Sequence, residues 1–171
     1  MNPSPSTPPR VRPLRPADHV VVTGLNDADV PRVGHLGVGG LAALLPHCDL
    51  ALVAERDGEV AGFVLAIAPG TGYASPNYRF FEARGTDHLY VDRIVTAPGH
   101  RRRGIASTLS AAVVDRARGT GRAEVTCEVN VVPPNPASWA FHAAHGFVEV
   151  GRQVTGGGAL TVALLARTLR A

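Results

Sequence analysis

Two kinds of apolar segment alternate along this chain and limit the folds open to it. Short runs typical of strands are separated by stretches in which apolar residues recur at helical spacing. The runs at 50–55 and 59–68 flank Asp57-Gly58, a pair that favours a β-hairpin turn. Helical stretches between the later strands require crossovers, so we expect an α/β fold with a mixed sheet. The expected strands are 11–14, 50–55, 59–68, 88–96, 124–129, 147–154 and 160–166.

Local signals at their ends define the helices. Ile105 and Leu109 recur at helical spacing, and Gly119 is a typical end for their helix. Asn135-Pro136 supplies an N-cap and a first helical position, and Gly146 closes that helix. The expected helices are 18–26, 37–45, 105–119 and 135–145, and residues 69–87 are interpreted as a long loop.

Length and composition favour one domain. A chain of 171 residues fits a single domain with its own core, which we expect over 11–171. Residues 1–10 are rich in Pro and Ser, lack the apolar segment of a secretory signal, and are expected to be a disordered tail. No apolar run is long enough to span a membrane, so no membrane partner is expected. Cys48 and Cys127 suggest neither a disulfide framework nor a metal site, and we expect no metal and a cytoplasmic location.

The cationic residues are unusual because all 17 of them are Arg. The formal net charge is only +3, whereas nucleic-acid-binding proteins usually carry larger basic patches with interleaved aromatic residues. We therefore expect no nucleic-acid partner. Three adjacent arginines at 101–103 are better suited to a small ligand that carries phosphate groups.

Residues 101–106 read Arg-Arg-Arg-Gly-Ile-Ala and lie between an expected strand and an expected helix. A helix N-terminus offers unpaired N–H groups and partial positive charge, and Gly104 lets the backbone approach a phosphate closely. Cations are mildly unfavourable at this end of a helix, and an anionic ligand would remove that conflict. Ile105 and Ala106 replace the Lys and Ser/Thr of a P-loop, so phosphate binding without Mg²⁺-dependent hydrolysis is expected.

Three segments of the chain resemble the Gcn5-related N-acetyltransferase (GNAT) superfamily. Arg101-x-x-Gly104-x-Ala106 is similar to its pyrophosphate-binding signature, and residues 90–96 are similar to its splayed fourth strand. Residues 135–142, followed by Gly146-Phe147, resemble its later motif. The resemblance extends over 11–166 in element order. It implies the GNAT fold, with a mixed central sheet, a splayed fourth and fifth strand, and four flanking helices.

The same resemblance implies acetyl-CoA as co-substrate. Backbone groups near Ile94 and Thr96 would pair with the pantetheine arm, and amides of the arginine-rich turn would hold the pyrophosphate. Asn135 would face the cofactor arm, although N-capping alone is an equal alternative. The implied cofactor-binding residues are Ile94, Val95, Thr96, Arg101, Arg102, Arg103, Gly104, Ile105, Ala106 and Asn135.

Two residues are candidates for proton transfer. Glu128 is similar to the strand glutamate that acts as base in ribosomal-protein N-terminal acetyltransferases; an outward-facing strand residue is the alternative. Asp92, with Tyr90 on the same strand face, is a second possible base, unless it pairs with Arg93. His142 stands where the family usually has a Tyr that protonates the coenzyme A thiolate; a plain helix-face histidine is the alternative.

The implied function is an N-acetyltransferase that moves an acetyl group from acetyl-CoA to a primary amine by direct attack in a ternary complex. The expected partner is a small-molecule amine or a peptide N-terminus, and a homodimer stays open. Residues 73–81 and Asn26 are expected to shape the acceptor pocket. Two alternatives remain: a non-catalytic acyl-CoA sensor on the same fold, and a dehydrogenase suggested by the G-x-G-x-x-A match at 37–42, which lacks the strand that such a motif needs before it.

Overall fold

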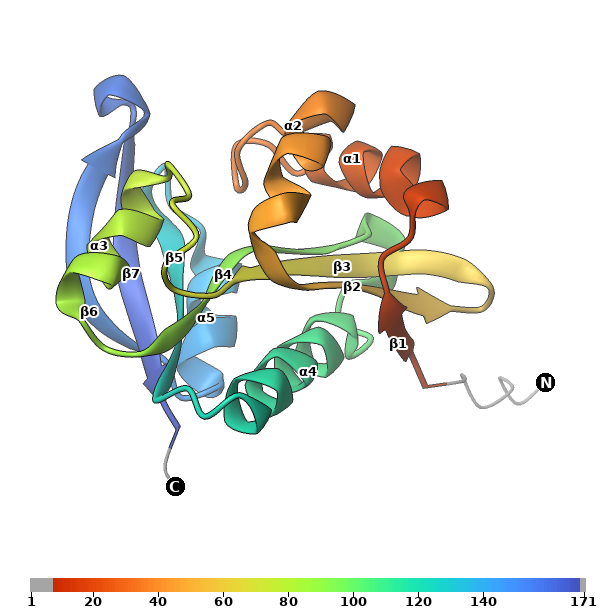
Figure 1. The fold of residues 1–171 in the computed structure, drawn as a ribbon. Coiled ribbons are helices and arrows are strands. Elements are labelled where there is room, and N and C mark those ends of the chain that lie inside the picture. The colour runs from red at the N-terminus through yellow and green to blue at the C-terminus, as the bar shows by residue number, and fades with distance from the viewer. Residues whose placement is uncertain (1–7, 170–171) are drawn as a thin grey trace. The chain divides into compact units, whose positions relative to one another are not determined.

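The computed structural model describes residues 8–169 and divides into two compact units (Figure 1). Unit 1 contains residues 8–46, 51–65 and 94–112, and unit 2 contains residues 47–50, 66–93 and 113–169. The expected disordered tail lies largely outside the described residues, since only residues 8–10 of it are described. Arg10 already belongs to the first strand. The expectation of one domain over 11–171 stays a prediction.

Seven strands lie within residues 8–169, and their hydrogen-bonded order is β1-β2-β3-β4-β5-β7-β6. β4 and β5 are parallel, whereas β1 with β2, β5 with β7, and β6 with β7 are antiparallel. The expected mixed α/β sheet is therefore confirmed. The strands are β1 (Arg10–Pro13), β2 (Cys48–Arg56), β3 (Glu59–Ile67), β4 (His88–Thr96), β5 (Glu124–Val132), β6 (Val148–Thr155) and β7 (Leu160–Thr168).

Five α-helices lie within the described residues, one more than the sequence led us to expect. They are α1 (His19–Asp27), α2 (Gly37–Leu44), α3 (Pro76–Arg84), α4 (Ile105–Gly119) and α5 (Pro136–Ala144). Within residues 8–169, no helix is long and apolar enough to cross a membrane.

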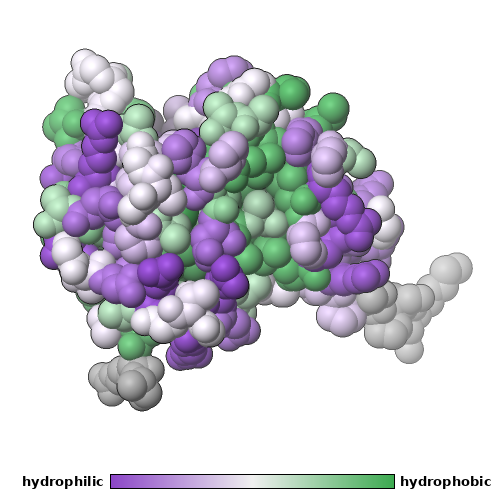
Figure 2. Space-filling view, viewed as in Figure 1, coloured by the Kyte–Doolittle hydropathy of each residue, from purple (hydrophilic) through white to green (hydrophobic). Residues whose placement is uncertain are grey.

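In unit 1 a tight hairpin joins β2 to β3. Asp57 and Gly58 have φ values of 53° and 83°, the left-handed pair that a two-residue hairpin turn of type I′ requires. Figure 1 shows α1 and α2 on one side of these strands and the first half of α4 on the other. The side chains of Leu41, Phe63 and Leu109 are fully buried in the core of this unit. Figure 2 shows hydrophobic surface over β2 and β3.

In unit 2 the parallel β4–β5 pair is short. Its register joins His88 to Glu124 and ends where Tyr90 pairs with Thr126. Both strands continue beyond that pair, β5 along β7. The expected splayed strands are thus present, and the splay begins directly after Tyr90.

Helix α3 occupies the middle of the segment that the sequence led us to interpret as a loop, so that interpretation was wrong over Pro76–Arg84. The missed signal is local: Ser75 accepts a hydrogen bond from the Tyr78 amide, and Pro76 holds the first helical position. Gly85 ends the helix with a left-handed φ of 70°. The helix buries Tyr78 and Phe81, two of the aromatic residues that the sequence assigned to the acceptor pocket.

Candidate active site

The arginine-rich segment forms an open turn at the N-terminus of α4, within unit 1. Gly104 has a φ of 81°, and a Cβ at this position would meet nothing within 4 Å. The Thr108 amide and hydroxyl both donate to the Gly104 carbonyl at 2.9 Å, which starts the helical hydrogen bonding. The N–H groups of the first turn have no acceptor within the helix, because the helix begins there. The turn therefore offers donors and space for a phosphate.

Two hydrogen bonds made by arginine side chains hold this turn in place. Arg56, a buried residue at the end of β2, donates from Nη1 to the Arg103 carbonyl at 2.9 Å. Arg101 donates from Nη2 to Asp29 Oδ1 at 2.9 Å and is 46% exposed in its side chain. The Arg101 guanidinium therefore already has an anionic partner. The turn's own capacity for a ligand anion rests more on its backbone donors and on the exposed Arg102 and Arg103.

The end of β4 lies close to this turn because β3 carries a glycine there. A Cβ on Gly62 would stand 2.6 Å from the Val95 carbonyl oxygen and 2.8 Å from Ile105 Cγ2. The Ala97 amide also donates to the Ala61 carbonyl at 2.9 Å. The glycine thus lets the end of β4 and the beginning of α4 pack closely against β3. Both segments belong to unit 1, as do most of the residues expected to bind the cofactor.

Asn135, the remaining residue of that set, lies in unit 2 and caps α5. Its Oδ1 accepts from the Ser138 amide at 3.3 Å, and Pro136 follows as the first helical residue. The N-cap expected from the sequence is therefore present. Contact of Asn135 with a cofactor stays a prediction.

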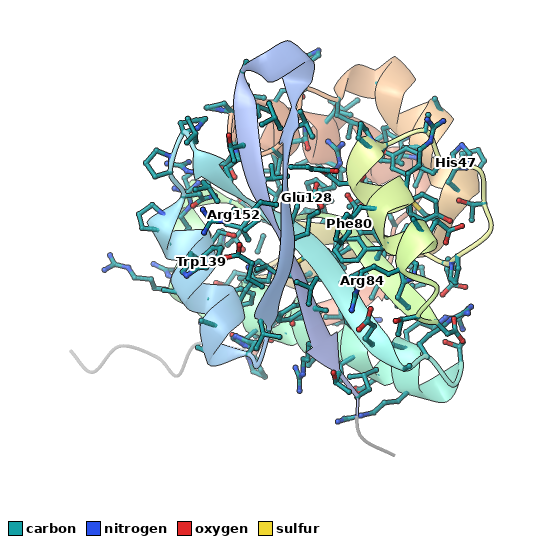
Figure 3. All side chains as sticks on the ribbon, turned by 90° about the vertical axis from the view of Figure 1, so that its left-hand side faces the viewer. His47, Phe80, Arg84, Glu128, Trp139 and Arg152 are labelled. Atoms are coloured by element: carbon teal, nitrogen blue, oxygen red, sulfur yellow. The ribbon has the colours of Figure 1, made fainter. Side chains whose placement is uncertain are left out.

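Two carboxylates in unit 2 lie directly beyond the last parallel pair of β4 and β5. Asp92 is two residues after Tyr90, and Glu128 is two residues after Thr126, so each side chain has the orientation of its paired neighbour. In Figure 3 Glu128 stands near the middle of the unit, with Phe80 and Arg84 of α3 to one side and Trp139 of α5 to the other. The splay of the strands thus opens the sheet next to two acidic groups.

Glu128 is held by two hydrogen bonds in partly buried surroundings. The Tyr90 hydroxyl donates to Glu128 Oε2 at 2.7 Å, and the Asn77 side chain also hydrogen-bonds to this carboxylate. Burial and then the negative charge of Asp92 raise the pKa of Glu128 to about 8, although Tyr90, Asn77 and Arg93 oppose that rise. A carboxyl group with a pKa near neutrality can exchange a proton with an amine at physiological pH.

Asp92 has different partners and is almost fully buried, with 4% of its side chain exposed. It accepts from Arg93 Nε at 2.8 Å, and the Tyr73 hydroxyl also hydrogen-bonds to it. Burial, followed by the charge of Asp92, raises the pKa of Tyr73. Asp92 is thus the carboxylate of an ion pair, the arrangement that the sequence offered as the alternative to its role as a base.

His142 is 6% exposed and has a fixed ring orientation on α5. Its Nδ1 lies 2.8 Å from the Ser138 carbonyl oxygen. Since a carbonyl oxygen only accepts, Nδ1 carries a proton and Nε2 is the free position of the ring. Burial lowers the pKa of His142, and the rings of Phe141 and Phe147 meet it edge-on. Burial thus favours the neutral form of the ring.

Cys127 is buried in β5 beside Glu128. Burial raises the pKa of its thiol well above the usual range, and the neighbouring carboxylate adds to this. Such a thiol is a weak nucleophile, because the thiolate is the reactive form. These surroundings therefore disfavour Cys127 as a nucleophile.

The sequence placed Asn77 in the segment expected to shape the acceptor pocket, but it revealed neither the contact of Asn77 with Glu128 nor Gln153 as its partner. Gln153 donates from Nε2 to Asn77 Oδ1, and the two residues are 76 positions apart. No local pattern connects positions so distant in the chain. Asn77 could have been noticed only as a polar residue in the first turn of the missed helix α3.

Comparisons with known proteins are consistent with these features. The family model described as "Acetyltransferase (GNAT) family" matches residues 30–147, more than half of the chain. No curated protein matches the sequence.

Among solved structures, Ard1 from Thermoplasma volcanium superposes with a TM-score of 0.79 at 16% identity, covering 96% of this chain and 100% of that one. The ribosomal-protein-S18-alanine N-acetyltransferase from Escherichia coli gives a TM-score of 0.73 at 16% identity and covers 95% of both chains. The acetyl-CoA-bound yncA of Salmonella typhimurium gives 0.69 at 18%, covering 96% of both. At these identities the superpositions establish the GNAT fold. With the family match over most of its length, this chain belongs to the GNAT family of acetyltransferases.

Proposed function

We propose that this chain transfers the acetyl group of acetyl-CoA to a primary amine by direct attack in a ternary complex, with Glu128 as the base. The environment of Glu128 carries the proposal: a carboxyl group beside the strand splay, bonded to Tyr90 at 2.7 Å, with a pKa of about 8. The GNAT family uses acetyl-CoA, and one structural neighbour was solved with acetyl-CoA bound. The acceptor is a small-molecule amine or a peptide N-terminus; the name of the E. coli neighbour gives it an alanine acceptor on a ribosomal protein.

The proposed cofactor site uses the open turn before α4. The pyrophosphate would be held by amides of residues 102–106, and the pantetheine arm would pair with the backbone of residues 94–96. The open space at Gly104 and the unpaired N–H groups of the first helical turn support this assignment. Bound acetyl-CoA would supply a thioester carbonyl that an amine can attack.

Glu128 would prepare the amine for that attack. At pH 7 an alkylamine or α-amine is largely an ammonium ion, which has no lone pair for attack. An ionised Glu128 can accept one ammonium proton, and its pKa of about 8 lies close to that of an α-amino group, so the transfer is nearly balanced in free energy. Tyr90 and Asn77 stabilise the ionised form of Glu128 that does this work.

His142 is proposed as the source of the proton for the departing thiolate. Nδ1 is occupied by the Ser138 carbonyl, so Nε2 is the position that would deliver a proton. The neutral ring carries its one proton on Nδ1, so Nε2 would first take up a proton from solvent and then pass it to the thiolate. Burial, which lowers the pKa of His142, opposes this uptake and makes the acid role more demanding than the base role of Glu128.

Release of free thiol from acetyl-CoA, screened across a panel of amines and short peptides, tests the proposal. Glu128→Gln keeps the shape of the side chain and removes the base, so we expect turnover to fall by roughly a hundredfold to ten-thousandfold. Glu149→Gln is the matched control, since Glu149 is an exposed residue of β6 paired with Arg152. Wild-type turnover in Glu128→Gln would contradict the assignment of the base.

A further inference from the structure

An amide pair lies next to the proposed base, and its second member, Gln153, does not itself contact Glu128. Asn77 is the second residue of α3, and Gln153 lies on β6. Gln153 Nε2 donates to Asn77 Oδ1, and Asn77 in turn hydrogen-bonds to Glu128 on β5. Three elements of unit 2 thus meet in one chain of hydrogen bonds.

The contact with Gln153 determines which end of the Asn77 amide faces Glu128. A side-chain amide has one acceptor end and one donor end. Because Gln153 already donates to Oδ1, the NH₂ group of Asn77 is the end available to the carboxylate. Without Gln153 the amide could turn over and present its oxygen to Glu128, which would disfavour the ionised carboxylate.

Helix α3 and strand β6 pack closely where Asn77 meets Gln153. A Cβ on Gly151 would stand 2.6 Å from Phe80 Cζ. Gly151 and Gln153 lie on the same face of β6, since they are two residues apart, and Asn77 and Phe80 lie on the same face of α3, since they are three apart. The glycine allows the helix to approach the strand at Phe80, and the same approach brings Asn77 to Gln153.

We propose that Gln153 is a positioning residue that acts through Asn77 to keep an N–H donor directed at the Glu128 carboxylate. This inference rests on the proposed function, because an ionised Glu128 is needed only if this residue acts as the base. The relay favours the ionised, proton-accepting form of a carboxyl group that its surroundings otherwise push toward the neutral form.

Several other groups act on Glu128 and have to stay unchanged in a test. Tyr90, Asp92 and Arg93 face it from β4, Tyr73 influences it from the segment before α3, and Cys127 is its neighbour on β5. Asn77 and Gln153 carry no charge, so substituting them by Leu changes the hydrogen bonds without adding a charge.

The test is a ¹³C NMR titration of the glutamate side-chain carboxyl carbons in the free protein. The Glu128 signal is assigned by its loss in Glu128→Gln. Asn77→Leu removes the donor, and we expect the titration midpoint to rise by about one pH unit. Gln153→Leu should raise it by less, because the Asn77 amide then samples both orientations. In the Asn77→Leu background, Gln153→Leu should add nothing.

Arg152→Leu is the control, since Arg152 is the exposed neighbour of Gln153 on β6 and should leave the midpoint in place. Asn77→Ser serves as a second variant if Asn77→Leu folds poorly. An unmoved midpoint in Gln153→Leu, or an equal rise with and without Asn77, overturns the relay. The titration needs neither acetyl-CoA nor an amine, so failure of the relay is distinct from failure of the proposed function, which would appear as absent amine acetylation by the wild type.

Discussion

At the scale of single residues, the state of Glu128 follows from a balance between burial and hydrogen bonding. Burial and the charge of Asp92 favour the neutral carboxyl group, and the donors on Tyr90 and Asn77 favour the ionised one. The first pair prevails, so the pKa rises from 4.5 to about 8. The residue is thus mostly protonated in the free protein at pH 7.

This raised pKa predicts a pH-dependent cost in stability. Between the unfolded pKa near 4.5 and the folded pKa near 8, the folded state holds a proton that the unfolded state releases, so the free energy of unfolding falls as pH rises through this window. Glu128→Gln cannot ionise, and its stability relative to the wild type should therefore increase from pH 5 to pH 9. Urea unfolding at both pH values measures this. A constant difference would mean that the carboxyl group titrates normally.

His142 gives a second prediction at this scale. If it protonates the departing thiolate, His142→Ala should lower kcat on the order of a hundredfold or more while acetyl-CoA binding stays near the wild-type level. His142→Tyr restores a donor and should recover part of the loss. His142→Phe matches Tyr in shape without the hydroxyl and should not recover it. Steady-state kinetics on the three variants decide this. A wild-type kcat in His142→Ala would mean that the residue only packs between Phe141 and Phe147 and donates no proton.

At the scale of elements, Gly62 controls how closely β3 packs against the end of β4 and the start of α4. Its Cβ would stand 2.6 Å from a backbone oxygen, so Gly62→Ala forces the proposed cofactor turn to shift. We expect the free energy of unfolding to fall by about 1–3 kcal/mol, as for other overpacked sites, and the thermal shift by acetyl-CoA to shrink. Gly99→Ala is the control, because a Cβ there meets nothing within 4 Å. Equal behaviour of the two variants would contradict this role of Gly62.

The elements that the sequence predicted well have strong local signals. The hairpin at Asp57-Gly58, the helix from Ile105 to Gly119 and the cap at Asn135 were all visible as turn or capping chemistry. Helix α3 was missed because its three aromatic residues, Tyr78, Phe80 and Phe81, suggested a binding loop. Its Ser75-Pro76 start was the signal that could have identified it.

The parts of the site show the same division. The arginine-rich turn and Glu128 were singled out from the sequence by their resemblance to the family, and their roles stay predictions. The partners that determine how Glu128 behaves come from elsewhere: Tyr90 is 38 positions away, and Gln153 reaches it only through Asn77. Such contacts depend on tertiary packing, which a single sequence does not encode locally.

At the scale of the whole molecule, the fold is shared with structures at 16–18% identity, so the fold alone does not determine the acceptor. The proposed function assigns cofactor binding to the turn before α4 and proton transfer to Glu128. A protein that bound acetyl-CoA without transferring its acetyl group would be an acyl-CoA sensor on the same fold. Cofactor binding therefore cannot distinguish the two functions, and only transfer can.

Transfer of an isotope-labelled acetyl group is the most direct measurement of that distinction. The wild-type protein is incubated with acetyl-CoA labelled in its acetyl group and with a panel of amines and peptides that carry free N-termini. We predict that mass spectrometry finds the label on at least one amine, in amounts equal to the free thiol released, and that Glu128→Gln suppresses both. The contrary result would be that acetyl-CoA binds and raises the melting temperature, but its label is lost no faster than in the absence of the protein. That result would contradict the assignment as an acetyltransferase.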